Sequence, residues 1–428
     1  MDDIISSGPD REPRWPRWRP GRRLKVVAAC VTLAVAASLV WYLPGVRHPG
    51  GQARPGSLAG GLATQDDGSA AAPDPLPTQP SLMTGRALPR GASLRLLVGG
   101  QTPAWSLVPS GRTEPIQGLP RGGNSYQLFR VAGGWAAQPF PPATASGGCA
   151  NCAPAPLPVY YVADGSRAAS LIGTADGQPA PTAGPGSLWL VSYPRGADMA
   201  TAAGTAREVS RTGAALGPPV RLPAGYVIDQ GTRAGLLLVQ EQASSGDFRY
   251  ELWDPGTRRV TRSFADVIAA SPTEIAWAPA CTGRCRVDVL NLTGGRTKEI
   301  PLPGQRTAGE GAFSPDGQLL ALLVNVGVTK DGYPAASQLM VATLASGRTA
   351  AVPGTTVGSG IGVNFGWQPG SRLLIAVVTA GAAGHVAADA PGQAEWQIAV
   401  WQPGAARLIT AIAQTPSQSW PVLDLGPY

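Results

Sequence analysis

Beyond about residue 92, apolar residues come in short runs, many of them alternating with polar residues, and Gly or Pro separates one run from the next. Alternation with a period of two is typical of a strand with one buried face, and short uniformly apolar runs are typical of strands buried on both faces. No stretch of this region has the apolar spacing of an amphipathic helix. The pattern therefore predicts an all-β architecture for residues 92–428.

One unit recurs through this region: a strand, a tight turn that contains Gly, and a second strand. Its seven copies begin at Trp105, Val159, Arg207, Tyr250, Val287, Leu339 and Ile398. A tight hairpin turn places a residue at positive φ, which glycine adopts without steric cost. The copies recur about every 48 residues, close to the period of propeller blades. The repeat predicts a single β-propeller with seven four-stranded blades, and six or eight blades are the alternatives.

The two ends of the predicted ring differ from the rest. The first unit has only three strand-like runs, Ser93–Val98, Trp105–Val108 and Thr113–Leu119, and an additional run, Ser419–Leu425, follows the seventh unit. We expect this last run to supply the missing strand of blade one, because closing the ring in this way leaves no strand edge exposed.

The other two strands of each unit lie in the intervening segments. The clearest segment contains Phe313, Ser314, Pro315, Asp316 and Gly317, where Pro fixes φ and Gly closes a turn between two buried strands. This Phe-Ser-Pro-Asp-Gly turn resembles the repeats of TolB-like and WD40-like β-propellers. The resemblance implies a propeller over most of residues 92–428 and a structural role for these five residues.

A second pattern lies near the N-terminus, where Val26–Leu43 contains no charged residue. As a helix this segment would be about 27 Å long, close to the thickness of a bilayer core. Seven Arg and Lys residues lie between Arg11 and Lys25, and such a basic flank stays in the cytoplasm. The chain is therefore predicted to have a cytoplasmic tail (1–25), a single transmembrane helix (26–43), and its remaining residues outside the cell membrane.

Three other interpretations of this segment fit less well. A cleaved signal peptide has a shorter apolar core and a small-x-small cleavage site, whereas Trp41 to Pro44 stand at that place here. A lipoprotein cysteine follows its apolar run, but Cys30 lies near the start of this one. The residues after Arg22-Arg23 do not match a twin-arginine signal well.

Residues 44–91, between the predicted helix and the predicted propeller, are rich in Pro, Gly, Ala, Ser and Thr and show no apolar periodicity. Such a segment buries too little apolar surface to offset the entropy lost on ordering. We expect a disordered linker that holds the propeller away from the membrane.

The net charge of +7 changes this picture little, because residues 1–25 contribute seven bases and four acids. The weak positive charge of the rest, together with a location outside the cell, argues against a nucleic-acid partner. Only three of the 34 basic residues are Lys, and Ala, Gly and Pro are abundant, as in the GC-rich genomes of actinobacteria.

The chain has only two histidines, His48 in the linker and His385 in a loop of small residues. Histidine is the commonest general base and a frequent metal ligand, so this scarcity argues against a Ser-His-Asp triad and a histidine metal site. No phosphate-binding Gly-rich loop and no Gly-x-Ser-x-Gly motif occurs. The sequence therefore predicts no catalytic residue, no metal site and no cofactor, and it predicts that most Trp residues of the propeller lie in the core.

Four cysteines lie beyond the predicted membrane helix: Cys149, Cys152, Cys281 and Cys285. An even number outside the cytoplasm favours two local disulfides, Cys281–Cys285 between neighbouring strands and Cys149–Cys152 in a Pro-rich loop. A four-cysteine zinc site is one alternative, but it would need the two pairs to meet from different blades. Thiol exchange at Cys149-x-x-Cys152 is another, although the sequence lacks the βαβ pattern of thioredoxins.

These features lead to three functional hypotheses. The first is a membrane-tethered, non-catalytic scaffold that binds a protein, peptide or glycan at the cell envelope. The second is a hydrolase or lyase that uses carboxylates such as Asp229, Asp247 and Asp331 at the mouth of the central channel. The third is envelope sensing or assembly through a membrane partner. Propellers have many unrelated functions, so the fold alone does not choose among these.

Overall fold

The propeller region is described by a computed structural model, which covers residues 83–92, 94–108, 110–120, 125–131, 133–140, 153, 155–241, 248–281, 283–304, 306–328, 334–358, 363–368, 370–378 and 393–416. All of these belong to one compact unit, Leu43–Tyr428. The named secondary-structure elements of these residues are all β-strands. Among the same residues there is no helix long and apolar enough to span a bilayer. The segment Val26–Leu43 lies outside the described residues, so its transmembrane helix stays a prediction.

The strands are short and follow one another closely along the chain, as the alternation of apolar runs with Gly and Pro predicts. The first half of them, in chain order, are β1 (Gly85–Ala87), β2 (Leu94–Val98), β3 (Ala104–Val108), β4 (Arg112–Pro115), β5 (Tyr126–Val131), β6 (Gly134–Pro139), β7 (Leu157–Ala163), β8 (Ala169–Ala175), β9 (Ala180–Pro181), β10 (Ser187–Ser192), β11 (Ala203–Ser210), β12 (Val220–Ala224), β13 (Val227–Thr232) and β14 (Gly235–Glu241). The others are β15 (Phe248–Asp254), β16 (Arg259–Phe264), β17 (Val267–Ala270), β18 (Glu274–Trp277), β19 (Arg286–Asn291), β20 (Thr297–Pro301), β21 (Ala308–Phe313), β22 (Leu319–Val328), β23 (Pro334–Thr343), β24 (Arg348–Ala351), β25 (Val357–Gly358), β26 (Val363–Gln368), β27 (Arg372–Val378), β28 (Gln393–Trp401) and β29 (Leu408–Pro416).

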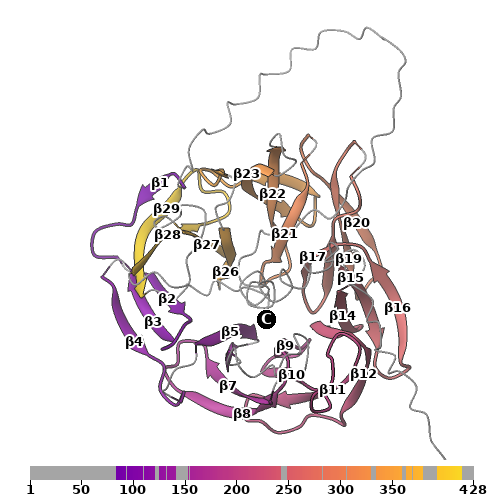
Figure 1. Ribbon diagram of the computed structural model, residues 1–428. Coiled ribbons are helices and arrows are strands. Elements are labelled where there is room, and N and C mark those ends of the chain that lie inside the picture. Colours follow the sequence, from indigo (N-terminus) through magenta and orange to yellow (C-terminus); the bar gives the residue numbers. More distant parts are fainter. Residues whose placement is uncertain are drawn as a thin grey trace, which may run out of the picture. The chain divides into compact units, whose positions relative to one another are not determined.

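In the described part of the chain these strands form seven sheets, each made almost entirely of neighbours in the sequence. We number them as blades: β2–β4 form blade 1, β5–β8 blade 2, β9–β12 blade 3, β13–β16 blade 4, β17–β20 blade 5, β21–β25 blade 6, and β26–β29 with β1 blade 7. The blades stand around a common centre, with β5, β9, β21 and β26 near it (Figure 1). The all-β class and the seven-bladed propeller predicted from the sequence are confirmed.

The recurring unit of the sequence is the outer hairpin of each blade. Its seven copies correspond to β3–β4, β7–β8, β11–β12, β15–β16, β19–β20, β23–β24 and β28–β29. Glycine recurs in the turn of this unit for the predicted reason, since Gly111 and Gly165 adopt positive φ values of 69° and 72° in their turns. The repeat seen in the sequence therefore arises because each blade contains one such hairpin.

Antiparallel pairing gives each blade two ends, which we call the turn face and the loop face. At the turn face, short turns join the first strand to the second and the third to the fourth. Turns of neighbouring blades can contact each other at this face. In one such contact the backbone N–H of Arg233 in blade 4 donates a hydrogen bond to the carbonyl of Pro272 in blade 5 at 2.9 Å. At the loop face the connections are longer, as between β6 and β7 (140–156) and between β27 and β28 (379–392).

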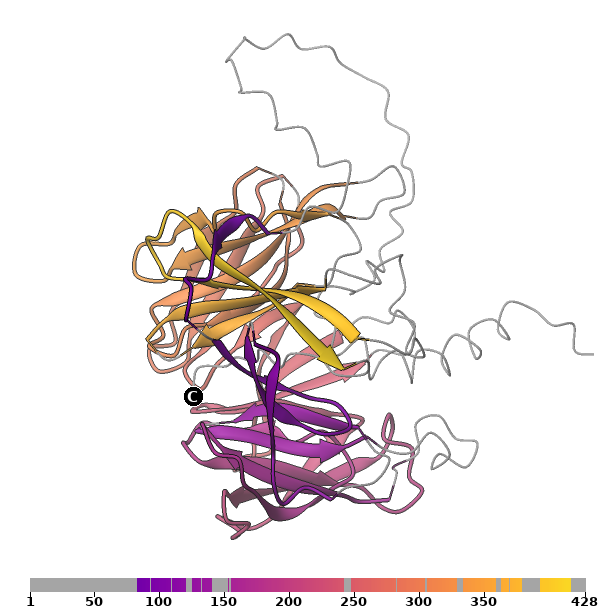
Figure 2. The same ribbon diagram turned by 90° about the vertical axis from the view of Figure 1, so that its left-hand side faces the viewer.

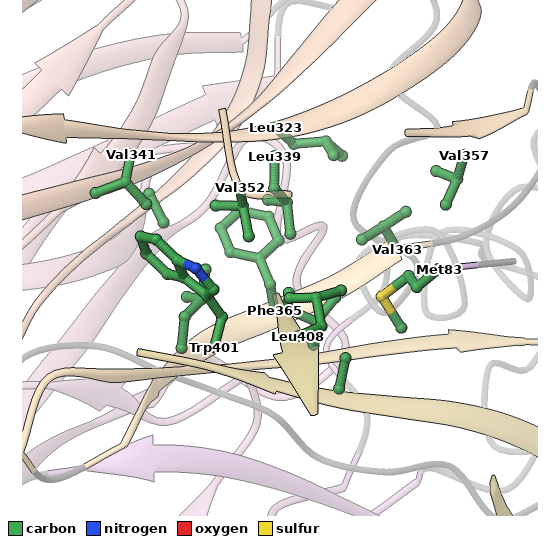
Figure 3. Close-up of a cluster of buried hydrophobic side chains, with 14 of the residues drawn as sticks. Met83, Leu323, Leu339, Val341, Val352, Val357, Val363, Phe365, Trp401 and Leu408 are labelled. Carbon is green, nitrogen blue, oxygen red and sulfur yellow. The ribbon is translucent and has the colours of Figure 1, made fainter. Parts of the chain in front are cut away.

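Apolar clusters between neighbouring sheets hold the ring together. The cluster between blades 6 and 7 contains Leu339 and Val341 from one sheet and Phe365 and Trp401 from the other, each at most 6% exposed (Figure 3). Burial of one such side chain contributes about 1.5–3 kcal/mol. Because every blade needs two neighbours to cover both of its faces, the ring is stable only as a whole.

The N-terminal part of the described chain is also built into this cluster. Met83 is 3% exposed among the residues of blades 6 and 7, and the side-chain amide of Gln397 binds both its N–H and its carbonyl, at 2.7 Å each. β1 then pairs in parallel with β29, Gly85 opposite Leu408. Met83 and β1, which fall within the segment predicted as a linker (44–91), are therefore part of the packed fold. A three-residue exposed strand has no hydrophobic pattern that could show this in the sequence.

Blade 1 has three strands within the described residues, as the sequence predicts, in the order β2-β3-β4. It adjoins blade 7, and this junction faces the viewer in Figure 2, with blade 7 in yellow and blade 1 in indigo. The run Ser419–Leu425, which is expected to complete blade 1, lies outside the described residues. Its role as the closing strand stays a prediction, and β1 supplies a second, independent connection across the same junction.

Candidate binding site

A cavity of about 210 Å³ opens where blades 7, 1 and 2 meet. Blade 1 contributes Arg95, Leu96 and Leu97 of β2, and the other two blades contribute residues on either side of it. From blade 2 come Arg130 and Trp135, and from blade 7 come Trp367 and Leu374.

The cavity follows the inner edge of β2. Leu96 and Leu97 point to opposite faces of the strand, because successive residues of a strand alternate. Leu96 packs with Leu374 and Ile398 of blade 7, whereas Leu97 packs with Leu128 and Trp135 of blade 2. Since both leucines line the same cavity, the cavity extends to both faces of β2. Trp105 of β3 and Asp164 and Gly165 of the β7–β8 turn line it as well.

Each of two arginines in this cavity lies on the face of a tryptophan. The guanidinium carbon of Arg95 lies 4.5 Å from the ring centre of Trp105, and that of Arg130 lies 5.0 Å from the ring centre of Trp135. The electron-rich face of an indole attracts a cation, by about 0.5–1 kcal/mol at exposed sites and more where water is excluded. The Arg130 side chain is only 15% exposed, so the stronger case applies to it. The stacking fixes both guanidinium groups at the cavity.

Arg95 and Arg130 also form ion pairs with carboxylates. Arg95 pairs with Glu114 at 3.3 Å, and Arg130 forms a two-pronged pair with Asp164, one of whose bonds measures 2.9 Å. Arg112 and Arg167 also lie within 4.0 Å of Glu114. We call these six residues the arginine cluster. Its four guanidinium groups meet two carboxylates, which leaves an excess of positive charge beside the cavity.

The tryptophans at this site differ in whether the indole N–H has a hydrogen-bond acceptor. Trp105 donates to the carbonyl of Ser166 at 2.7 Å, and Trp367 donates to that of Ala312 at 2.8 Å. Trp135 is 6% exposed, and its N–H has no hydrogen-bond acceptor among the described residues. A buried donor without an acceptor costs about 1–3 kcal/mol. The site thus offers a strand edge and positive charge, next to a tryptophan whose buried N–H is unpaired among the described residues.

The Phe-Ser-Pro-Asp-Gly turn has the structural role that its resemblance implies. Phe313 is fully buried between blades 5 and 6. The Asp316 carboxylate accepts hydrogen bonds from Ser314 Oγ at 2.6 Å and from Ser371 Oγ of blade 7 at 2.9 Å. Pro315 and Gly317 complete the turn, with Gly317 at a φ of 65°. These residues join blade 6 to blade 7 at the turn face and do not line the cavity.

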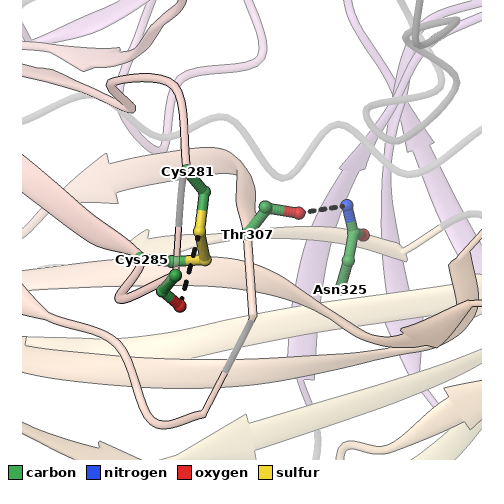
Figure 4. The surroundings of a disulfide bond; sticks show 5 residues. Cys281, Cys285, Thr307 and Asn325 are labelled. Atoms are coloured by element: carbon green, nitrogen blue, oxygen red, sulfur yellow. Dashed lines mark hydrogen bonds between the residues drawn. A yellow bond between two sulfur atoms is a disulfide. The ribbon is translucent and has the colours of Figure 1, made fainter. Parts of the chain in front are cut away.

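Among the predicted disulfides, Cys281 and Cys285 are joined at the loop face of blade 5 (Figure 4). Cys285 is 3% exposed and packs within the apolar cluster between blades 5 and 6. Beside the bridge, Asn325 donates to Thr307 Oγ1 at 3.3 Å. Cys149 and Cys152 lie outside the described residues, so their pairing stays a prediction.

The carboxylates proposed for a hydrolase are not brought together by the described residues. Asp229 lies on β13 of blade 4, while Asp247 and Asp331 lie outside the described residues. The innermost strands carry one further acid, Glu310, on β21 of blade 6. Within the described ranges no three His, Cys, Asp or Glu residues form a group that could hold a metal ion.

Sequence reasoning placed the tryptophans in the core, which holds for Trp105, Trp135, Trp253 and Trp367, all at most 9% exposed. It did not identify that three of them, Trp105, Trp135 and Trp367, line one cavity. The sequence signal that points to the site is an arginine within a largely apolar strand: Arg95 in LRLLV and Arg130 in YQLFRV.

No protein-family model matches this sequence, and no curated protein matches it either. Several solved structures are similar in fold. TolB from Acinetobacter baumannii is 12% identical over 62% of this chain and 63% of its own, with a TM-score of 0.35. A prolyl endopeptidase is 14% identical over 79% of this chain and 50% of its own, with a TM-score of 0.48. An acylaminoacyl peptidase is 10% identical over 74% of this chain and 48% of its own, with a TM-score of 0.47.

TolB is thus among the solved structures with a similar fold, in line with the resemblance of Phe313–Gly317 to TolB-like β-propellers. The chain matches between about half and two thirds of the length of these structures. At such low identity the similarity concerns the fold alone. The seven sheets of the described residues show by themselves that the chain is a β-propeller.

Proposed function

We propose that this protein is a membrane-tethered, non-catalytic propeller outside the cell membrane, and that it binds an extended polypeptide segment at the cavity of blades 7, 1 and 2. The observation that carries the proposal is the inner edge of β2, which has no neighbouring strand among the described residues and lies in that cavity. A free strand edge presents a row of backbone donors and acceptors, which an extended peptide pairs with by adding a strand.

The chemistry around the edge favours a peptide over the other ligands. Leu96, Leu97 and Leu374 supply apolar contacts on both sides of the strand, and Trp135 beside them has a buried N–H without an acceptor among the described residues. A glycan-binding platform would require aromatic rings open to solvent, whereas Trp105 and Trp135 are 9% and 6% exposed. The excess positive charge of the arginine cluster favours a segment that carries an acidic residue.

The location follows from features of the sequence. An uncharged run of bilayer length, flanked by arginines on its N-terminal side, supports a single anchor with the propeller outside. The Cys281–Cys285 bridge is consistent with an oxidising compartment, where such bonds persist. On this proposal the linker of residues 44–82 spans the distance between the anchor and Met83.

The binding site is tested by photo-cross-linking in native membranes. A photoreactive amino acid replaces Gln368, which lines the cavity at the end of β26, and the control carries it at Ile409, which is 39% exposed on the outer strand β29. We expect a polypeptide cross-linked in trans at position 368 and not at position 409.

Two variants of the full chain sharpen this test. Arg95→Gln removes one positive charge of the cluster, and Trp135→Phe removes the unpaired N–H. We expect each to reduce the cross-linked product several-fold, whereas Arg286→Gln, far from the cavity in blade 5, should not. Equal cross-linking at positions 368 and 409 would contradict the proposal. So would catalytic turnover by the purified protein that a single substitution abolishes.

A further inference from the structure

We infer that the turn face between blades 1 and 2 carries a second binding site, where three arginines of the arginine cluster bind a phosphate monoester group. The three are Arg95, Arg112 and Arg167, all within 4.0 Å of the Glu114 carboxylate. The site goes beyond the proposed function, because Arg112 and Arg167 do not line the cavity at which a peptide is proposed to bind.

The carboxylate of Glu114 is shared unequally by the three arginines. Arg95 Nη2 lies 3.3 Å from Glu114 Oε2 and donates a hydrogen bond to it. The nearest nitrogen of Arg167 is 3.9 Å away and that of Arg112 is 4.0 Å away, both beyond hydrogen-bond distance. Neither of these two side chains donates a hydrogen bond elsewhere among the described residues. Glu114 therefore offsets one of three positive charges and leaves two guanidinium groups with donors to offer.

The backbone that carries each arginine is fixed by pairing within the fold. Arg95 lies on β2, and its guanidinium is stacked on Trp105 at 4.5 Å. Arg112 belongs to β4, which pairs with β3. Arg167 lies in the β7–β8 turn, where its carbonyl accepts the N–H of Gln117 at 2.6 Å. A ligand thus has to order only the ends of the Arg112 and Arg167 side chains, which keeps the entropy cost of binding low.

The charge and the number of donors favour a phosphate group over a carboxylate. A carboxylate carries one negative charge, and Glu114 shows that such a group leaves two of the three arginines without a hydrogen bond. A phosphate monoester carries a charge of about −1.5 to −2 at neutral pH and has three acceptor oxygens. The arginine cluster has four guanidinium groups and two carboxylates, an excess of two positive charges. Since guanidinium groups bind phosphate through paired N–H donors, the monoester matches both the charge and the donors.

The two carboxylates of the cluster differ in how they affect such a ligand. Both oxygens of Asp164 accept hydrogen bonds from Arg130, so this pair is closed. Glu114, in contrast, is hydrogen-bonded to only one of its three arginines. A phosphate group that binds Arg112 and Arg167 comes close to the Glu114 charge, and repulsion between the two anions weakens the binding. Glu114 thus limits the affinity of the site.

The site is tested by titrating the full chain, in micelles of an uncharged detergent, with glycerol phosphate and measuring the dissociation constant by calorimetry. Arg112→Gln and Arg167→Gln should each raise this constant at least fivefold, because each removes one charge and its donors. The control is Arg348→Gln, which removes the same charge from an exposed arginine of β24 in blade 6. Absence of binding, or an equal loss in the control, would overturn the inference.

Glutamate substitutions test the competition within the site. Glu114→Gln should lower the dissociation constant of glycerol phosphate at least fivefold. Glu299→Gln removes the same charge from a glutamate of blade 5 that is 68% exposed and lies 3.7 Å from Arg286, and it should have no effect. Equally tighter binding in both variants would show that only the net charge matters and would contradict the inference.

The choice of phosphate is tested with succinate, whose two carboxylates carry a similar charge. Succinate should bind at least tenfold more weakly than glycerol phosphate, and equal binding would overturn this choice. Phosphatidic acid added to the micelles then distinguishes a lipid headgroup from a soluble phosphate ester. Displacement of glycerol phosphate would assign the site to a headgroup, absence of displacement would assign it to a soluble ester, and both outcomes support the site.

The inference and the proposed function fail separately. Arg112→Gln should leave the cross-linking of a polypeptide at position 368 unchanged, because Arg112 does not line the cavity. A loss of cross-linking as large as that in Arg95→Gln would show that the two sites are one, and it would overturn this inference while the proposed function stands.

Discussion

Asp176 is a buried carboxylate whose pKa is changed by the fold. It is 6% exposed, one oxygen accepts the N–H of Tyr193 at 2.6 Å, and the other has no hydrogen-bond partner among the described residues. Burial raises the pKa of Asp176 above its ordinary value, and burial also raises the pKa of Tyr193 to about 12. The fold therefore favours the uncharged form of both side chains.

The substitution Asp176→Asn tests this charge penalty. Because the pKa of Asp176 is higher in the folded than in the unfolded state, the free energy of unfolding falls as the pH rises between those two values. Asparagine keeps an oxygen for the N–H of Tyr193 and carries no charge. We expect the variant to have a higher Tm than the wild type at about pH 8 and a similar Tm at about pH 3. Equal shifts at both pH values would show that the charge is not responsible.

The arginines of the cavity show what the sequence does and does not reveal about single residues. A charge inside the apolar runs LRLLV and YQLFRV is visible in the sequence. Each arginine–tryptophan contact lies within one hairpin, β2–β3 for Arg95 and β5–β6 for Arg130. That both contacts border one cavity is not visible in the sequence, because the residues that line the cavity come from three different sheets. The sequence predicted the tryptophans as core residues, and only the arrangement of blades shows which of them border a cavity.

At the scale of elements, the turn Ser314–Gly317 links two blades through one carboxylate. Burial alone would raise the pKa of Asp316, but hydrogen bonds from Ser314, from the N–H of Gln318 and from Ser371 lower it. The stabilisation by this charge is present at neutral pH and is lost as the pH falls through the lowered pKa.

We expect Asp316→Ala to lower the free energy of unfolding by about 1–3 kcal/mol, since it leaves Ser314 and Ser371 without their acceptor. The matched control is Asp254→Ala, because Asp254 accepts hydrogen bonds only within its own exposed turn, from Thr257 and Gly256. Its effect should be clearly smaller in chemical denaturation. If the two variants were equally destabilised, the contact between blades would contribute nothing.

The N-terminal segment is a second element whose packing can be tested. Gln397→Leu removes both hydrogen bonds to the backbone of Met83, at a cost of about 1–3 kcal/mol. We expect faster trypsin cleavage after Arg86 and Arg90 in the native protein. Gln138→Leu, which removes a buried glutamine between β6 and the end of β8, should lower stability without exposing these sites. Cleavage at the wild-type rate in Gln397→Leu would contradict the clamping role of this glutamine.

At the scale of elements the sequence predicted most of the fold. The seven hairpins, the three strands of blade 1 and the turn at Phe313–Gly317 each have a local pattern of apolar residues and glycine that the structure reproduces. β1 was missed because a short exposed strand has no pattern, and its pairing with β29 joins residues from opposite ends of the propeller.

For the whole molecule, the account predicts a single anchor and an external propeller. In intact cells, added protease should degrade residues 83–428 while a cytoplasmic marker stays intact. Deletion of residues 26–43 removes the uncharged run and should leave the protein out of the membrane fraction. Recovery of the unaltered chain from the soluble cytosolic fraction would refute the proposed location.

The packing of blades in the ring also explains why the edge of β2 is a candidate binding surface. Each blade buries both faces against its neighbours, so the only backbone groups that remain for binding lie at strand edges and turns. Within the described residues, blade 1 is the one sheet with fewer than four strands. The central claim is that an extended segment, from this chain or from a partner, pairs with that edge.

Hydrogen exchange of the β2 amides in the full chain tests this claim most directly. If the inner edge is paired, amides Leu94–Val98 should exchange about as slowly as those of β14, which has a neighbour on each side. Weakening the predicted closing strand Ser419–Leu425 with Trp420→Ala and Asp424→Asn together should speed the exchange of β2 and leave β14 unchanged. Exchange of every second β2 amide as fast as in an exposed edge strand, already in the wild type, would contradict the account.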